Sequence, residues 1–129
     1  MNQKPDVPRY PTNWGVRFLC DCKKYGQAIN IQQGIAHEIS TQGLRLLSDH
    51  HICKEKKVAL QLMIPPLQSG TPLEIIKIIG HSIVTIMKDG KFLTEIKFLH
   101  FEENGLTRLE RNLQQHFDPQ FFSPTVKRA

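Results

Sequence analysis

The sequence predicts a mainly β domain: a small antiparallel β-barrel of about six or seven strands with one C-terminal α-helix. Three observations support this fold class. Short apolar segments, alternating or continuous, are separated by Gly, Pro and Asp-Gly turns over most of the chain. Helical spacing of apolar residues begins only at Asn104. A length of 129 residues suits one domain with one core. An open sheet of the same strands is the alternative.

The first half of the chain contains four expected strands, at 16–22, 28–39, 44–47 and 58–64. In the first, Cys20 and Cys22 share the face of Val16 and Phe18 and are expected in the core. A turn is expected at 23–26. The second carries Ile29, Ile31, Ile35 and Ile39 at even spacing, with Gly34 as a candidate bulge. The fourth is a dense apolar run ended by Pro65 and Pro66.

The second half predicts a long hairpin followed by the helix. Residues 73–87 are rich in β-branched side chains, and Gly80 is expected to bend this strand. Asp89-Gly90 suits a two-residue type I′ turn, because both positions need positive φ. The strand after it carries on one face Phe92, Thr94, Ile96, Phe98 and His100. The helix is expected to run to about Phe117 with Asn104 as N-cap, and its apolar positions include Leu106, Leu109 and Leu113. The placement of the tail with Phe121, Phe122 and Pro124 is left open.

The charge balance narrows the classes of partner. The chain has 17 Lys and Arg against 12 Asp and Glu, a net charge of +5, which favours an anionic ligand. The basic residues are scattered and do not form a stripe for a DNA backbone, so no DNA partner is expected. No apolar run reaches the roughly 18 residues of a membrane span, and residues 1–6 lack the apolar core of a secretory signal. A cytoplasmic protein without membrane insertion is therefore expected.

Cysteine spacing and catalytic motifs give no sign of a metal centre or an enzyme. Three cysteines without a signal peptide favour reduced thiols, and the spacing of Cys20, Cys22 and Cys53 relative to the histidines fits no zinc-ligand pattern. The sequence also lacks GxSxG, HExxH, GxxxxGK(S/T) and GxGxxG motifs. We therefore expect no metal, no cofactor, no catalytic residues and no enzymatic activity. An RNA-binding barrel is less favoured, because the aromatic residues among basic ones are only Tyr10, Trp14 and Tyr25.

A compact polar turn between two strands is the strongest candidate site. Glu38, Ser40 and Gly43 supply a carboxylate, a hydroxyl and a backbone that another group can approach closely. Residue chemistry alone favours a plain connecting turn in which Ser40 binds its own backbone.

The order of elements from about Val7 to Phe117, together with Glu38-x-Ser40-x-x-Gly43 and the following Leu44-Arg45-Leu46, resembles the PilZ domain family. The resemblance implies a six-stranded barrel with a C-terminal helix, formed by one domain (1–129) with a core at 7–117, a flexible lead at 1–12 and a tail at 118–129. It also implies a bacterial receptor for cyclic di-GMP that uses an RxxxR motif before the first strand and a (D/N)xSxxG motif after the second.

The match to these motifs is partial. Ser40 and Gly43 fit the second motif, whereas Glu38 replaces Asp or Asn and moves the carboxylate by about 1.5 Å. The first motif keeps one arginine in either register, Arg9 or Arg17, and Arg9 is preferred because it precedes the strand. The implied ligand-binding residues are Arg9, Arg17, Glu38, Ser40 and Gly43.

The resemblance implies a non-enzymatic cyclic di-GMP receptor that regulates an unidentified protein in motility, pilus, biofilm or secretion processes. The alternative is a degenerate PilZ-like adaptor that docks a protein and no longer binds the nucleotide. The sequence leaves the partner and the oligomeric state open.

Overall fold

The computed structural model describes residues 7–20 and 31–117. This part of the chain forms six strands and one helix: β1 (Trp14–Cys20), β2 (Gln32–Ile39), β3 (Gly43–Ser48), β4 (Lys57–Ile64), β5 (Glu74–Lys88), β6 (Lys91–Phe101) and α1 (Gly105–Phe117). The strands close into a barrel in the order β1-β2-β3-β6-β5-β4, with every neighbouring pair antiparallel. The predicted mainly β fold, a closed antiparallel barrel followed by one helix, is confirmed.

The long hairpin of β5 and β6 has the predicted turn. Asp89 and Gly90 have φ angles of +52° and +82°, and Lys88 pairs with Lys91 across them. Gly80 lies at a register shift between β5 and β6, as expected for a bend. The irregularity there also affects β6: Phe98 is buried, but His100 is exposed and does not continue the expected inward face.

The bulge in β2 is not at Gly34. Gly34 pairs regularly with Val16, and the register shift lies between Ala36 and Glu38. The extra residue reverses the alternation of side chains beyond it. As a result Ile35 is 41% exposed while Ile39 is fully buried, so the single apolar face implied by their even spacing is wrong. The same reversal turns Glu38 outward.

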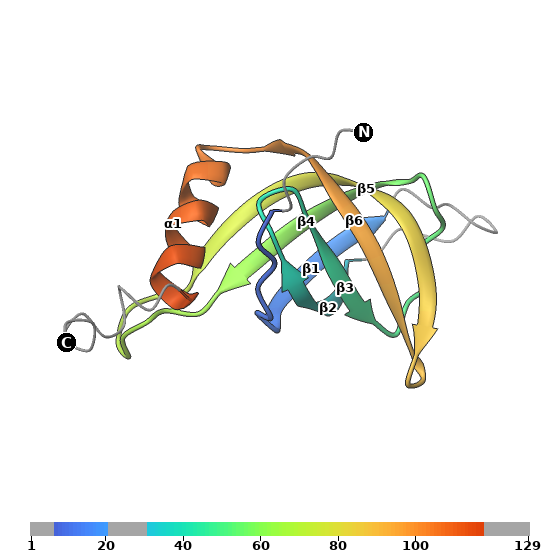
Figure 1. Ribbon diagram of the computed structural model, residues 1–129, viewed down its shortest axis with the longest axis horizontal. Coiled ribbons are helices and arrows are strands. Elements are labelled where there is room, and N and C mark those ends of the chain that lie inside the picture. The colour runs from blue at the N-terminus through green and yellow to red at the C-terminus, as the bar shows by residue number, and fades with distance from the viewer. Residues whose placement is uncertain (1–6, 21–30, 118–129) are drawn as a thin grey trace.

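The barrel interior is filled by apolar side chains from all six strands, and α1 covers one end of it (Figure 1). Leu109 and Leu113 of α1 are buried against this core, whereas Leu106 is 39% exposed. Trp14 is only 5% exposed; its ring meets His116 edge-on, with the centroids 5.0 Å apart. The β5–β6 turn lies at the end of the barrel remote from α1 (Figure 1).

A cluster of polar contacts fixes the helix to the start of β5. Glu74 accepts hydrogen bonds from Arg108 Nε at 2.7 Å and from Asn112 Nδ2 at 3.0 Å. Burial alone would raise the pKa of Glu74, but these hydrogen bonds and the nearby arginine charges outweigh it and hold the pKa below its usual value. Asn104 precedes the helix as expected, and its carbonyl accepts the Arg108 N–H at 3.0 Å. Its φ of +61° differs from the extended conformation of a usual N-cap.

Several expectations lie outside the described residues. These are the position of Cys22, the turn at 23–26, the first residues of the 28–39 segment, and the placement of the aromatic tail. Within the described part, Cys20 is partly buried against the core next to Phe18, as expected for this face of β1.

Candidate functional site

The lead, of which the structure describes residues 7–12, is attached to the end of β2 by backbone pairing. Tyr10 and Ile39 exchange two hydrogen bonds, with N···O distances of 2.8 and 3.0 Å. Further along, the buried Thr12 hydroxyl donates to the carbonyl of Ala36 at 2.7 Å. Arg9 therefore lies directly before Tyr10, which is hydrogen-bonded to the last residue of β2, next to the Ser40 turn.

The turn itself is held together by Ser40. The Ser40 N–H donates to the Gly43 carbonyl at 2.9 Å, and the Ser40 hydroxyl accepts from the Gln42 and Gly43 N–H groups at 3.0 and 3.3 Å. Ser40 is 6% exposed. The hydroxyl therefore serves the turn, as the purely structural interpretation of this motif predicts.

Gly43 is required by the approach of a neighbouring strand and not by an unusual backbone angle. A Cβ added at Gly43 would meet the Ile96 carbonyl oxygen well inside 3.0 Å, a separation that real Cβ atoms essentially never show. Gly43 pairs with Lys97, and the adjacent Gln42 carbonyl accepts the Phe98 N–H at 2.8 Å. Gly43 thus allows β3 and β6 to join next to the turn.

A row of charged side chains crosses three strands on the outer surface beside this turn. Glu38 on β2 is paired in register with Arg45 on β3, which is paired with Glu95 on β6. Arg45 Nη1 lies 3.6 Å from Glu38 Oε1, and Arg45 Nε lies 3.7 Å from Glu95 Oε1. Arg9 reaches the same two carboxylates, at 3.8 Å from Glu38 Oε1 and 3.4 Å from Glu95 Oε2. We call these four residues the charged row.

The charged row contains two residues that the motif analysis did not assign to the site. Arg45 follows the motif in the sequence, within Leu44-Arg45-Leu46, and Glu95 lies in the second strand of the long hairpin. Their role in the site depends on the β2-β3-β6 register, for which the sequence carries no direct signal. All four side chains are partly exposed, between 31% and 46%, so a solute can reach them.

Arg17 is separate from the other predicted site residues. It is exposed on β1, where it pairs with Gln33 of β2 and Gln61 of β4. Gln33 precedes Glu38 by five positions in the strand, a separation of about 15 Å. The structure thus brings together Arg9, Glu38, Ser40 and Gly43, and leaves Arg17 apart.

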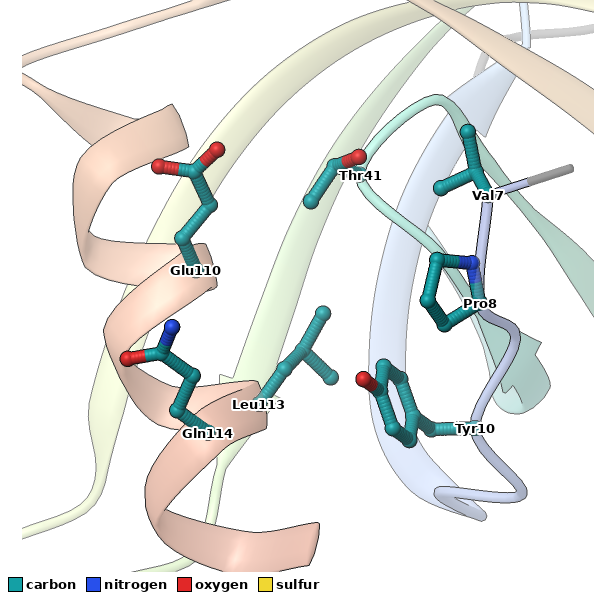
Figure 2. Close-up of a pocket in the computed structure, with 7 residues that line it drawn as sticks. All are labelled: Val7, Pro8, Tyr10, Thr41, Glu110, Leu113 and Gln114. Carbon is teal, nitrogen blue, oxygen red and sulfur yellow. The ribbon is translucent and has the colours of Figure 1, made fainter. Parts of the chain in front are cut away.

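A cavity of about 330 Å³ lies between the lead, the Ser40 turn and α1, on the side of the lead away from the charged row. Figure 2 shows Pro8 and Tyr10 facing Glu110 and Gln114 of the helix, with Leu113 between them. Arg9 does not line this cavity. The aromatic ring of Tyr10 stacks on Phe117, with centroids 5.1 Å apart. The lead therefore contacts the helix on one side and the charged row on the other.

An apolar row runs beside the charged row on the same outer surface. Its members are cross-strand neighbours on β2, β3, β6 and β5: Ile35, Leu47, Leu93 and Ile86. Ile35 and Ile86 are 41% and 53% exposed, and the nearby Val84 is 46% exposed. A shallow depression joins the two rows and is lined by Arg45, Val84, Ile86, Leu93 and Glu95.

The described residues contain neither a metal-ligand cluster nor a membrane-spanning helix. Among residues 7–20 and 31–117, no three His, Cys, Asp or Glu side chains are grouped so that they could hold a metal ion. Within the same part of the chain, no helix combines the length and the apolar character needed to cross a membrane.

Comparison with known proteins identifies the fold. No protein-family model matches the sequence, and no curated protein matches it. Among solved structures, the chain is similar to the Bacillus subtilis inhibitor of motility MotI/DgrA, with a TM-score of 0.65 and 10% identity over 99% of this chain and 55% of that one. It is also similar to a tetrameric PilZ-domain protein of Xanthomonas campestris, with a TM-score of 0.53 and 18% identity over 74% of this chain and 50% of that one. The chain has a PilZ-like fold and spans about half the length of these two proteins.

Proposed function

We propose that the protein is a cytoplasmic, non-enzymatic receptor for cyclic di-GMP that regulates a partner protein. The observation that carries this proposal is the position of Arg9. The backbone pairing of Tyr10 with Ile39 brings the Arg9 guanidinium within 3.8 Å of Glu38, next to the Ser40 turn of a PilZ-like barrel. The site thus offers an arginine for a phosphate and a carboxylate for a guanine base, and both side chains are partly exposed.

The two side chains would contact different parts of the ligand. The planar guanidinium of Arg9 pairs bidentately with a phosphate, and it also stacks on a base. The carboxylate of Glu38 accepts hydrogen bonds from the adjacent N–H donors of a guanine edge. The turn keeps Glu38 and β3 in fixed positions, because Ser40 binds its backbone and Gly43 joins β6. These contacts bind the ligand and do not catalyse a reaction on it.

Calorimetric titration of the purified protein with cyclic di-GMP tests the proposal. We expect measurable heat that Arg9→Ala reduces, with affinity falling about tenfold to a hundredfold for one charged hydrogen bond. Arg17→Ala is the matched control and should change affinity by less than about twofold, since Arg17 lies apart from the site. No heat up to high micromolar ligand would refute the receptor function.

The alternative function is an adaptor that binds a protein and has lost the nucleotide. Two observations favour it: the Ser40 hydroxyl is used by its own turn, and the neighbouring Ile35–Ile86 apolar row is accessible. The adaptor interpretation predicts no heat with cyclic di-GMP for the wild-type protein. It also predicts that Arg9→Ala leaves partner binding unchanged, whereas a charge placed in the apolar row abolishes it.

A further inference from the structure

The charged row holds two arginines, although the sequence motif before β1 retains one. Arg9 comes from the lead and Arg45 from β3, and both approach the same oxygen, Glu38 Oε1, at 3.8 and 3.6 Å. Both also approach Glu95, at 3.4 Å from Arg9 and 3.7 Å from Arg45. The two guanidiniums therefore lie side by side around one pair of carboxylates, on an exposed surface.

We propose that Arg45 supplies the second phosphate-binding guanidinium of this site and that Glu95 is the carboxylate that the ligand phosphates displace. This inference rests on the proposed receptor function and assigns roles that the motif does not contain. Arg45 and Arg9 together bind the two phosphates of the dinucleotide. Glu38 meets a guanine edge through its other oxygen, Oε2, while Oε1 stays beside the two guanidiniums.

The position of Arg45 is set by the barrel itself. Its strand, β3, pairs with β6 from Gly43 onward, two residues before Arg45. Pairing of β3 with β2 and β6 places Arg45 opposite Glu38 on one side and Glu95 on the other. Because the backbone of β3 is already ordered, binding through Arg45 requires no further ordering of the main chain. Arg9 and Arg45 are 46% and 39% exposed, so their donors are accessible to a phosphate.

Glu95 holds the arginines only loosely. Its contacts of 3.4 and 3.7 Å exceed the 2.7 to 2.9 Å typical of a strong charged N–H···O bond. Exposed ion pairs of this kind contribute little to stability. Phosphate oxygens that accept short bonds from the two guanidiniums therefore replace Glu95 at small cost.

The charge of the row makes the role of Glu95 measurable. The charges of the two arginines and the two glutamates cancel, so a dianionic ligand meets no net positive charge at the charged row. Replacing Glu95 with Gln keeps its shape, removes one negative charge and leaves the arginines in excess. We expect cyclic di-GMP to bind Glu95→Gln about fivefold to tenfold more tightly than wild type.

The experiment is a set of calorimetric titrations of the full chain with cyclic di-GMP at one fixed salt concentration. Arg45→Ala should weaken binding about tenfold to a hundredfold, and Arg45→Lys should recover part of the loss, since lysine keeps the charge without the planar fork. Glu95→Gln should tighten binding, and the control Arg17→Ala should change affinity by less than about twofold. Thermal melts of each variant confirm that it is folded.

The outcomes separate this inference from the function on which it rests. If Arg9→Ala weakens binding but Arg45→Ala changes affinity by less than about twofold, the receptor function stands and the role of Arg45 is refuted. Unchanged or weaker binding by Glu95→Gln refutes the displacement of Glu95. If neither wild type nor Glu95→Gln gives heat up to high micromolar ligand, the receptor function fails and this inference fails with it.

Discussion

The substitution Gly43→Ala tests whether the glycine of the turn motif is needed for the fold itself. The added Cβ would lie well inside 3.0 Å of the Ile96 carbonyl oxygen. This neighbour is backbone within the β3–β6 ladder, so it cannot move away as a side chain could. Relief of the clash requires β3 and β6 to separate where Gly43 pairs with Lys97 and where the Gln42 carbonyl accepts the Phe98 N–H.

Two terms set the size of the effect. Forcing one extra carbon into a packed position costs typically about 1 to 3 kcal/mol. Weakening one or two backbone hydrogen bonds adds about 1 kcal/mol. We therefore expect Gly43→Ala to lower the free energy of unfolding by about 2 to 4 kcal/mol. With a urea m-value near 1.5 kcal/mol/M, the unfolding midpoint falls by roughly 1.3 to 2.7 M.

Urea unfolding followed by circular dichroism measures this shift, and Gly15→Ala is the matched control. Gly15 is also a strand glycine without positive φ, but its added Cβ would meet only the mobile methyl of Met63, at 3.1 Å. The control should lose less than about 1 kcal/mol. A loss below about 1 kcal/mol for Gly43→Ala would refute the close-approach argument and leave ligand contact as the reason for this glycine.

Three further predictions concern the helix and the lead. Glu74→Gln should lower the free energy of unfolding in urea by about 2 kcal/mol at pH 7, because it weakens charged hydrogen bonds. The pKa of Glu74 is held below 4.5, so the difference between wild type and variant should shrink as the pH falls below that value. Burial lowers the pKa of His116 below 6.5, and a hydrogen bond to the Pro65 backbone opposes this shift without cancelling it. The unfolded chain therefore binds the proton more readily than the folded protein. Stability followed by the fluorescence of Trp14, the single tryptophan, should fall as pH drops below 6.5, and His116→Gln should remove that dependence. Thr12→Val should cost about 1 to 3 kcal/mol in thermal or urea unfolding, since it leaves a carbonyl of β2 without its buried donor.

Local sequence signals predicted the hairpin and the barrel well. Asp89-Gly90 specifies a turn through the φ angles of two residues, and both angles are positive in the structure. Gly80 was expected to bend β5 and lies at a register shift. These features depend on residues close together in the chain, so a single sequence contains the information that determines them.

The bulge in β2 shows where local signals fail. Gly34 suggested a bulge because glycine is common at such positions, but here it allows close packing: an added Cβ would meet the Leu47 carbonyl oxygen at 2.8 Å. The true shift near Glu38 has no glycine to mark it. It is specified by tertiary structure, because Ile39 must be buried while Ile35, four residues earlier, faces outward.

The candidate site depends on that same shift, which explains why motif matching found only half of it. The bulge turns Glu38 to the outer surface, where the register of three strands aligns it with Arg45 and Glu95. The lead then adds Arg9 through a single pair of backbone hydrogen bonds at Tyr10. A motif that lists residues along the chain cannot contain an arginine contributed by a neighbouring strand.

The lead also gives the site a physical route to the helix. Tyr10 pairs with Ile39 through its backbone and stacks on Phe117 through its ring, while the adjacent Arg9 faces the charged row. Any ligand that pulls Arg9 away from Glu95 acts on a segment whose next residue contacts the C-terminal end of α1. Binding at the charged row and packing of the helix therefore share one short stretch of backbone, and a change in one is expected to alter the free energy of the other.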